Sequence, residues 1–195
     1  MKTALVVVDI QNDFCPDGAL AVAEGDQVVE PTNHLIGQFR RRGGLVIYTR
    51  DWHPENHCSF KSFGGPWPVH CVQSTPGAQF HRDLDVPDDA VILNKAWMPD
   101  SEDLSGKRSS ELFPRLTQAG VRRLVVAGLT TEYCIKATVH DARAEGFEVI
   151  VITDAIRAVN VRPGDGQRAL DDMRARGAAL LTSAEFLGAF PEVGK

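Results

Sequence analysis

The chain alternates short apolar runs with longer stretches of mixed polarity. Six runs have the length and composition of buried strands, at residues 3–8, 45–48, 91–93, 124–127, 149–152 and 179–181. Helices are predicted from about Asp26 to Gly43-Gly44, after Ser109 to Gly120, from about Thr131 to Gly146, and from about Asp165 to Gly177. Each predicted helix is followed by glycine, which is the usual residue just past a helix C-terminus.

Regular alternation of strands and helices predicts an α/β fold. We expect a doubly wound, mostly parallel six-stranded sheet with helices on both faces. At 195 residues, the chain should form a single domain over residues 1–195. One segment, at about residues 50–88, lacks periodicity and is rich in His, Pro, Gly and aromatic residues. A long irregular segment inside a compact domain is usually functional.

Composition and charge exclude several classes of partner. Hydrophobic residues make up 43% and charged residues 24%, as in ordinary globular proteins. The net charge of −5 and the absence of a basic cluster longer than Arg40–Arg42 argue against nucleic acid. The apolar runs are too short to span a bilayer, so no membrane association is expected. Whether the chain forms homo-oligomers is left open.

The N-terminus and the cysteines indicate a cytoplasmic protein. Met1 to Thr3 lead straight into the first predicted strand, which leaves no room for a signal peptide. The four cysteines show neither CxxC spacing nor the density of a disulfide-rich protein. We therefore expect reduced thiols.

Three reactive side chains follow predicted strands. Asp9 comes directly after the first strand, Lys95 follows the third, and Cys134 follows the fourth after a turn at Gly128. In open α/β sheets the functional crevice lies beyond the carboxyl ends of the strands. Taken singly, Asp9 could be a turn former, Lys95 a solvated strand end and Cys134 a small buried hydrophobe. Taken together, they predict a base, a cation and a nucleophile at one sheet edge.

The position of Cys134 favours the nucleophile. It lies where a helix is predicted to begin, and the positive end of the helix dipole favours the thiolate. The preceding turn also offers backbone N–H groups that could hold a developing oxyanion.

The irregular segment contains a set of side chains suited to a metal. Four candidate ligands fall within twenty residues: Asp51, His53, His57 and His70. Imidazole and carboxylate suit Zn²⁺, Fe²⁺ or Mn²⁺, so we expect one divalent transition metal ion. The alternative is that the histidines are ordinary surface loop residues. Two neighbouring thiols, Cys58 and Cys71, are not included in the set.

Three motifs resemble the isochorismatase-like cysteine hydrolases. They are Asp9-Ile-Gln-Asn-Asp13-Phe14, Asn94-Lys95-Ala96-Trp97 and Gly128-Leu-Thr-Thr-Glu-Tyr-Cys134. The resemblance extends over nearly the whole chain. The metal-like set narrows it to the nicotinamidase branch, whose members are also called pyrazinamidases.

The resemblance implies hydrolysis of a small-molecule amide, nicotinamide, to nicotinate and ammonia in NAD salvage. Cys134 would attack the carboxamide carbon and form a thioester. Asp9 would accept the thiol proton and pass it to the leaving ammonia, while Lys95 stabilises the anionic states.

The resemblance also assigns the surroundings of the reacting atoms. Backbone N–H groups of Thr130 and Cys134 would form the oxyanion hole, next to a cis peptide bond between Leu129 and Thr130. Phe14 and Trp67 would hold the flat ring between them. The metal would bind the ring nitrogen directly or through water.

Three other functions compete with this one. A metal-independent amidohydrolase of the same superfamily, acting on a carbamoyl or ureido compound, would keep the three reactive residues. A nucleotide-binding module is disfavoured because the chain lacks a G-x-G-x-x-G fingerprint. A purely structural metal protein would leave Asp9, Lys95 and Cys134 without a role.

Overall fold

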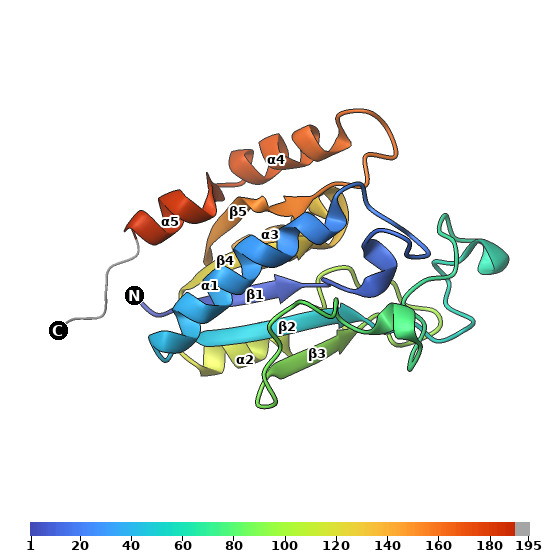
Figure 1. Ribbon diagram of the computed structural model, residues 1–195, viewed down its shortest axis with the longest axis horizontal. Coiled ribbons are helices and arrows are strands. Elements are labelled where there is room, and N and C mark those ends of the chain that lie inside the picture. The colour runs from blue at the N-terminus through green and yellow to red at the C-terminus, as the bar shows by residue number, and fades with distance from the viewer. Residues whose placement is uncertain (190–195) are drawn as a thin grey trace.

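A computed structural model describes residues 1–189 of the chain, which form one six-stranded sheet flanked by helices (Figure 1). The sheet order is β3-β2-β1-β4-β5-β6, and every neighbouring pair is parallel. The strands are β1 (Thr3–Val8), β2 (Leu45–Asp51), β3 (Val91–Lys95), β4 (Arg123–Leu129), β5 (Glu148–Arg157) and β6 (Ala179–Leu181). The helices are α1 (Val29–Arg41), α2 (Leu112–Gln118), α3 (Lys136–Ala144), α4 (Asp165–Ala175) and α5 (Ser183–Ala189). The predicted doubly wound sheet is confirmed, whereas α5 was not predicted.

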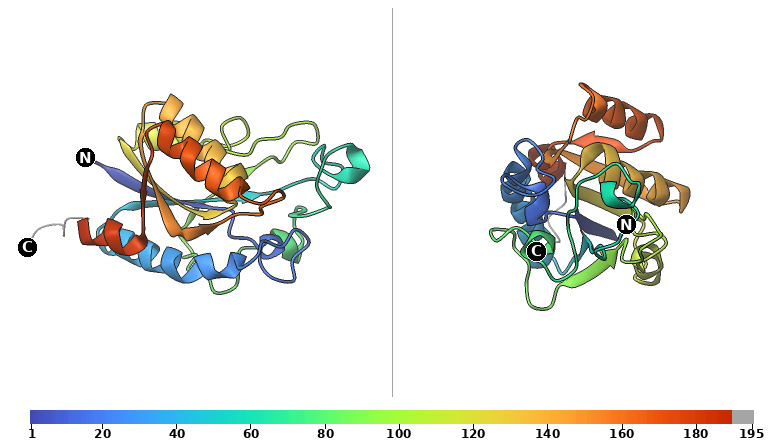
Figure 2. Two further views of the ribbon diagram at one scale, coloured as in Figure 1. Left: turned by 90° about the horizontal axis from the view of Figure 1, so that it is seen from above. Right: turned by 90° about the vertical axis from the view of Figure 1, so that its right-hand side faces the viewer.

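Helices cover both faces of the sheet because successive side chains of a strand point to opposite sides (Figure 2). In β1, Ala4, Val6 and Val8 join one core cluster, which contains the apolar faces of α2, α3 and α4. Leu5 and Val7 join the other, which contains those of α1 and α5. All five side chains are fully buried, so β1 lies at the centre of the molecule.

The helix ends follow local chemistry. Gly43, Gly120, Gly146 and Gly177 all have positive φ, as expected for glycine just past a helix. The starts of α1 and α2 lie a few residues later than predicted. Each of these helices has a proline as its third residue, and the first turn is where a missing N–H is tolerated.

The strands run further toward their carboxyl ends than the apolar pattern indicates. β2 continues through Thr49 and Arg50 to Asp51, and β3 continues to Lys95. These polar residues interrupt the apolar run but keep the parallel pairing, in which Asp51 lies opposite Lys95. As a result, the Asp51 carboxylate and the Lys95 ammonium lie at the ends of neighbouring strands.

Between β2 and β3 the chain leaves the sheet for residues 52–90. The only helical turns in this segment are the short 3-10 turns Lys61–Phe63 and Pro76–Ala78. The early part of this segment projects past the carboxyl edge of the sheet (Figure 2). Among residues 1–189, no helix combines the length and apolar character needed to cross a membrane.

The close approach of β4 to β1 at Gly128 yields a test of the fold. Gly128 has a φ of +123°, and a Cβ there would overlap the carbonyl oxygen of Val8. We expect Gly128→Ala to lower the free energy of unfolding by at least about 3 kcal/mol, from strain and overlap together. Gly146 also has positive φ, at +86°, but a Cβ there meets open space. Gly146→Ala should therefore cost only about 1 kcal/mol in urea unfolding. Equal losses would contradict the importance of the close approach.

Candidate active site

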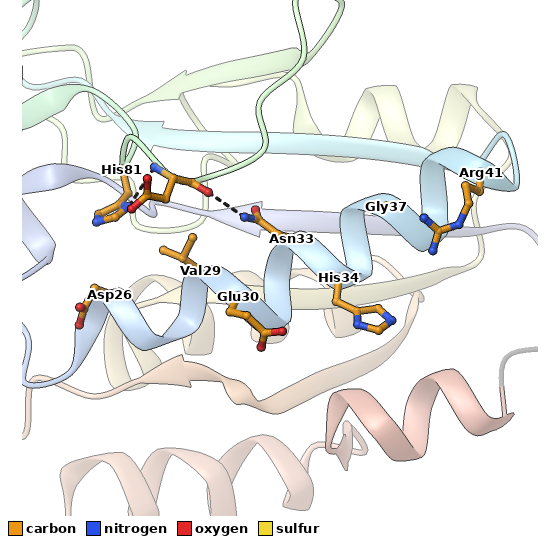
Figure 3. A pocket seen from close by; sticks show the side chains of 9 residues that line it. Asp26, Val29, Glu30, Asn33, His34, Gly37, Arg41 and His81 are labelled. Carbon is orange, nitrogen blue, oxygen red and sulfur yellow. Dashed lines mark hydrogen bonds and ion pairs between the residues drawn. The ribbon is translucent and has the colours of Figure 1, made fainter.

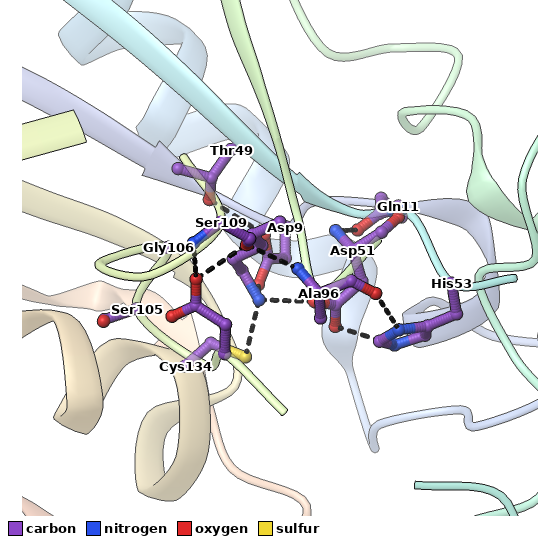
Figure 4. A network of polar contacts seen from close by, with 12 residues as sticks. Asp9, Gln11, Thr49, Asp51, His53, Ala96, Ser105, Gly106, Ser109 and Cys134 are labelled. Carbon is purple, nitrogen blue, oxygen red and sulfur yellow. Dashed lines mark hydrogen bonds and ion pairs between the residues drawn. The ribbon is translucent and has the colours of Figure 1, made fainter. Parts of the chain in front are cut away.

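Lys95 is fully buried at the end of β3 and is the centre of a cluster at the carboxyl edge of the sheet. Figure 4 shows Asp9, Asp51 and Cys134 of this cluster close together. Lys95 Nζ lies 2.9 Å from Asp9 Oδ2 and 2.5 Å from Asp51 Oδ1. It also donates a hydrogen bond to Cys134 Sγ at 3.3 Å. The structure therefore brings together the three reactive residues predicted from strand ends, and it adds Asp51 to them.

The charges in this cluster depend on one another. Burial alone would lower the pKa of Lys95, but the two carboxylates raise it well above its ordinary value. Burial raises the pKa of Asp9 to about 6, against the opposing effect of Lys95. For Asp51, burial is outweighed by Lys95 and His53, and the pKa falls to about 2. Asp9 is thus the more basic carboxylate, and Thr49 Oγ1 donates a hydrogen bond to its Oδ1 at 2.8 Å.

Burial of Cys134 opposes the thiolate that its position in the sequence was expected to favour. Burial raises the pKa of its thiol well above the ordinary value, and the attraction of Lys95 only partly offsets this. Cys134 is the fourth residue of a buried π-helical turn, Thr131–Ile135, which leads directly into α3. A raised thiol pKa calls for a nearby base that accepts the proton during attack. Asp9 offers a carboxylate oxygen within 4.8 Å of Sγ.

The turn before Cys134 is tightly folded. The Leu129–Thr130 peptide bond is cis, as the family resemblance implied. The Thr130 carbonyl accepts hydrogen bonds from the N–H groups of Tyr133, at 3.2 Å, and Ile135, at 3.1 Å. Residues 130–135 are thereby held as one unit at the end of β4.

Three of the predicted metal ligands lie together. Asp51, His53 and His70 are buried, and one ligand atom from each lies within 4.8 Å of the others. His57 is not part of this tight group, but its ring stacks on that of His53 with centroids 4.2 Å apart. The two residues also line one small pocket.

Two of the histidine rings are oriented in a common way, with Nδ1 on a backbone carbonyl: His53 on that of Ala96 (3.1 Å) and His70 on that of Pro68 (2.8 Å). His57 differs, because its Nε2 faces the Ser101 carbonyl at 3.3 Å and its Nδ1 accepts the Ser59 N–H at 3.3 Å. A ring nitrogen that faces a carbonyl must carry the proton, which leaves Nε2 of His53 and His70 with a free lone pair. Burial also lowers the pKa of His53 to about 4, so this ring is neutral near pH 7. Neutral imidazoles held through Nδ1 are the usual form of metal-binding histidines.

A narrow pocket leads to the Cys134 thiol. Phe14 and Trp67, the predicted ring-binding aromatics, both line it. The Tyr133 ring meets Trp67 edge-on, with centroids 5.0 Å apart. Sequence reasoning missed Tyr133 and the aliphatic residues Leu20, Leu104 and Val159, which also line the pocket. These aliphatic residues lie in separate loops, and no motif links them.

A second, more open hollow lies along α1, away from this centre (Figure 3). Its wall contains Glu30, Asn33, His34 and His81, and none of the clustered residues described above. Asn33 Nδ2 donates a hydrogen bond to the Asp83 carbonyl there, at 2.7 Å. The reactive groups of this chain therefore gather at the sheet edge and not in this hollow.

Comparison with known proteins agrees with this geometry. The isochorismatase domain model matches residues 3–185. A nicotinamidase of Escherichia coli (strain K12) is 41% identical, over 94% of this chain and 96% of the relative. The structure of a pyrazinamidase of Pyrococcus horikoshii in complex with zinc is 48% identical, with a TM-score of 0.88 over 93% of this chain and 99% of that one.

A third similar protein was solved with a small molecule bound. The structure of PnC1 from L. infantum in complex with nicotinate is 33% identical, with a TM-score of 0.87 over 94% of each chain. The family model and the similarity of both sequence and fold extend over nearly the full length. This chain therefore belongs to the isochorismatase family.

Proposed function

We propose that this chain hydrolyses nicotinamide, and analogues such as pyrazinamide, to the carboxylate and ammonia, in NAD salvage. The observation that carries the proposal is the buried Lys95 ammonium, which holds Asp9 and the Cys134 thiol beside the Asp51–His53–His70 group. The nicotinamidase and pyrazinamidase relatives support it. A metal-independent amidohydrolase of carbamoyl or ureido compounds would leave the histidine group unexplained.

The first half of the reaction forms a thioester. An amide is a poor electrophile, and covalent catalysis divides its hydrolysis into two easier steps. Cys134 Sγ attacks the carboxamide carbon while its proton passes to Asp9. Lys95 offsets the negative charge that develops, and the N–H groups of Thr130 and Cys134 donate to the oxyanion. Asp9 then gives the proton to the leaving nitrogen, the C–N bond breaks and ammonia departs.

The second half releases the acid. A water molecule attacks the thioester carbon, and Asp9 accepts a proton from it. The C–S bond breaks, Asp9 returns the proton to the Cys134 sulfur, and the carboxylic acid product leaves and releases its own proton to solvent. A carboxylate with a pKa near 6 suits this repeated acceptance and donation of a proton better than an ordinary aspartate would.

The pocket fits a flat apolar ring. Phe14 and Trp67 provide aromatic walls, and Leu20, Leu104 and Val159 complete an apolar lining. Pockets of this kind bind the body of a ligand through apolar contact and orient it through a few polar groups.

The polar anchor for the ring would be a metal ion. Asp51, His53 and His70, with His57 beside them, would hold one divalent Zn, Fe or Mn ion. The fit rests on the donor set, since Asp51 is charged and two rings present Nε2 lone pairs. When bound, the ion supplies an electrophilic anchor for the ring nitrogen, directly or through water.

The nucleophile is tested by removal of its sulfur. Cys134→Ala should reduce ammonia release from nicotinamide to background while leaving thermal unfolding cooperative, because no other group can form the thioester. Cys58→Ser is the matched control, since Cys58 is half-buried and lies outside the Lys95 cluster. Substantial turnover by Cys134→Ala would remove Cys134 from the mechanism.

The base is tested by an isosteric change. Asp9→Asn keeps the shape of the side chain but cannot accept the thiol proton. Single-turnover hydrolysis of nicotinamide should slow by about 10²–10⁴-fold, which is the usual contribution of a general base. A rate within threefold of the unsubstituted chain would mean that the proton leaves by another route.

The metal is tested with two substrates. Purified protein should hold about one equivalent of a divalent transition metal, as such ligand sets do. Chelation or His53→Ala should then impair hydrolysis of nicotinamide much more than that of benzamide, which has no ring nitrogen to anchor. Proportional loss with both substrates would contradict the anchoring role, and full activity of metal-free protein on a ureido compound would favour the other amidohydrolase.

A further inference from the structure

Gln11 completes the sheet at the point where β1 ends. The backbone hydrogen bonds between β1 and β2 stop with Asp9 N–H to the Thr49 carbonyl, at 3.1 Å. Asp9 has a φ of +49°, which turns the chain out of the sheet. β2 nevertheless continues to Asp51. On the edge of β2 that faces β1, the backbone N–H and carbonyl of Asp51 therefore have no strand beside them.

The side-chain amide of Gln11 takes the place of the missing strand. Asp51 N–H donates to Gln11 Oε1, and Gln11 Nε2 donates to the Asp51 carbonyl, each at 2.8 Å. A primary amide offers the same donor and acceptor as a peptide group, so one side chain satisfies both the N–H and the carbonyl of Asp51. The second hydrogen of Nε2 goes to the Ala78 carbonyl at 3.0 Å. Gln11 is fully buried, and its donors and acceptor are all occupied.

Asp13 makes a comparable contact two residues later. Its Oδ2 accepts the Cys71 N–H at 2.7 Å. Cys71 directly follows His70 and has a φ of +46°, a conformation that a side chain rarely adopts without support. The Cys71 carbonyl in turn accepts the His53 N–H at 3.0 Å. A Cβ on Gly77 would overlap the Asp13 carboxylate, so glycine there leaves room for it.

We infer that Gln11 and Asp13 are positioning residues for the metal site. Gln11 fixes the backbone of Asp51. Asp13 fixes the backbone of Cys71, which directly follows His70 and whose carbonyl accepts the His53 N–H. The inference rests on the proposed metal site and assigns a role to two side chains that touch neither the metal position nor the reacting atoms.

The intervening residue, Asn12, provides a matched control. Its Nδ2 donates to the Pro76 carbonyl at 2.8 Å, toward the surface. Asn12→Ala removes a hydrogen bond from the same segment without touching the backbone of any proposed ligand.

Two isosteric substitutions each take away one hydrogen-bonding group without opening a cavity. In Gln11→Glu, an acceptor would replace the donor that faces the carbonyls of Asp51 and Ala78. In Asp13→Asn, the amide has a single oxygen for the two backbone N–H groups, of Cys71 and Ala19, that the carboxylate now accepts.

The experiment measures metal affinity directly. Each metal-free variant is titrated with Zn²⁺ in competition with a chromogenic chelator, and the visible spectrum of its Co²⁺ form reports the ligand geometry. Loss of such outer contacts typically weakens metal binding by about 10–100-fold. We expect that loss and an altered Co²⁺ spectrum for Gln11→Glu and Asp13→Asn, with Asn12→Ala within about twofold of the unsubstituted chain. Gln11→Met is prepared in parallel and removes the amide without adding a charge. It replaces Gln11→Glu in the comparison if that variant does not unfold cooperatively.

The outcomes separate this inference from the proposed function. Zn²⁺ affinities in Gln11→Glu, Gln11→Met and Asp13→Asn equal to that of Asn12→Ala would overturn the positioning role. So would an equal loss in Asn12→Ala. If the variants lose metal as expected but the unsubstituted chain fails to hydrolyse nicotinamide, only the proposed function is wrong. If the unsubstituted chain binds no metal, the metal site and this inference fail together.

Discussion

The buried ammonium of Lys95 is the interaction on which the centre of this protein depends. A lysine buried alone would lose its charge, and two carboxylates buried alone would gain protons. Asp9 and Asp51 keep the ammonium charged, and the ammonium in turn keeps Asp51 ionised. Removal of one member of such a buried group typically costs about 3–5 kcal/mol, because a charge is left without a partner. The same cation lies against Cys134, so stability and chemistry share one contact.

Asp51 joins the two halves of the site. One carboxylate oxygen contacts Lys95, and the other faces His53 Nε2 at 3.7 Å. This sharing is possible because β2 and β3 stay paired beyond the end of β1, so that Asp51 and Lys95 lie side by side. The sheet itself therefore fixes Asp51 beside Lys95, while the contact of Asp13 with Cys71 fixes the backbone next to His70.

The sequence predicted what depends on order along the chain. Asp9, Lys95 and Cys134 were found because carboxyl ends of parallel strands share an edge, and the histidines because they are dense in one irregular segment. The effect of burial on the pKa of the Cys134 thiol was not predictable, since it depends on how deeply a turn is buried once α3 and α4 pack. The strand extensions were missed because polar residues break the apolar pattern where pairing continues. Pocket residues such as Leu104 and Val159 are brought together only by the fold.

The placement of segment 52–90 bears on how this family can diversify. The segment leaves the sheet at β2 and returns at the neighbouring strand β3, and all three histidines of the site lie on it. Since each doubling of a flexible loop's length costs only about 0.6 kcal/mol of closure entropy, evolution can resize such an excursion while the strand order stays intact. A descendant that lost these histidines would keep Asp9, Lys95 and the thiol on the sheet. It would be free to adopt amides with no ring nitrogen, so the proposed dependence on a metal is separable from the proposed catalytic residues.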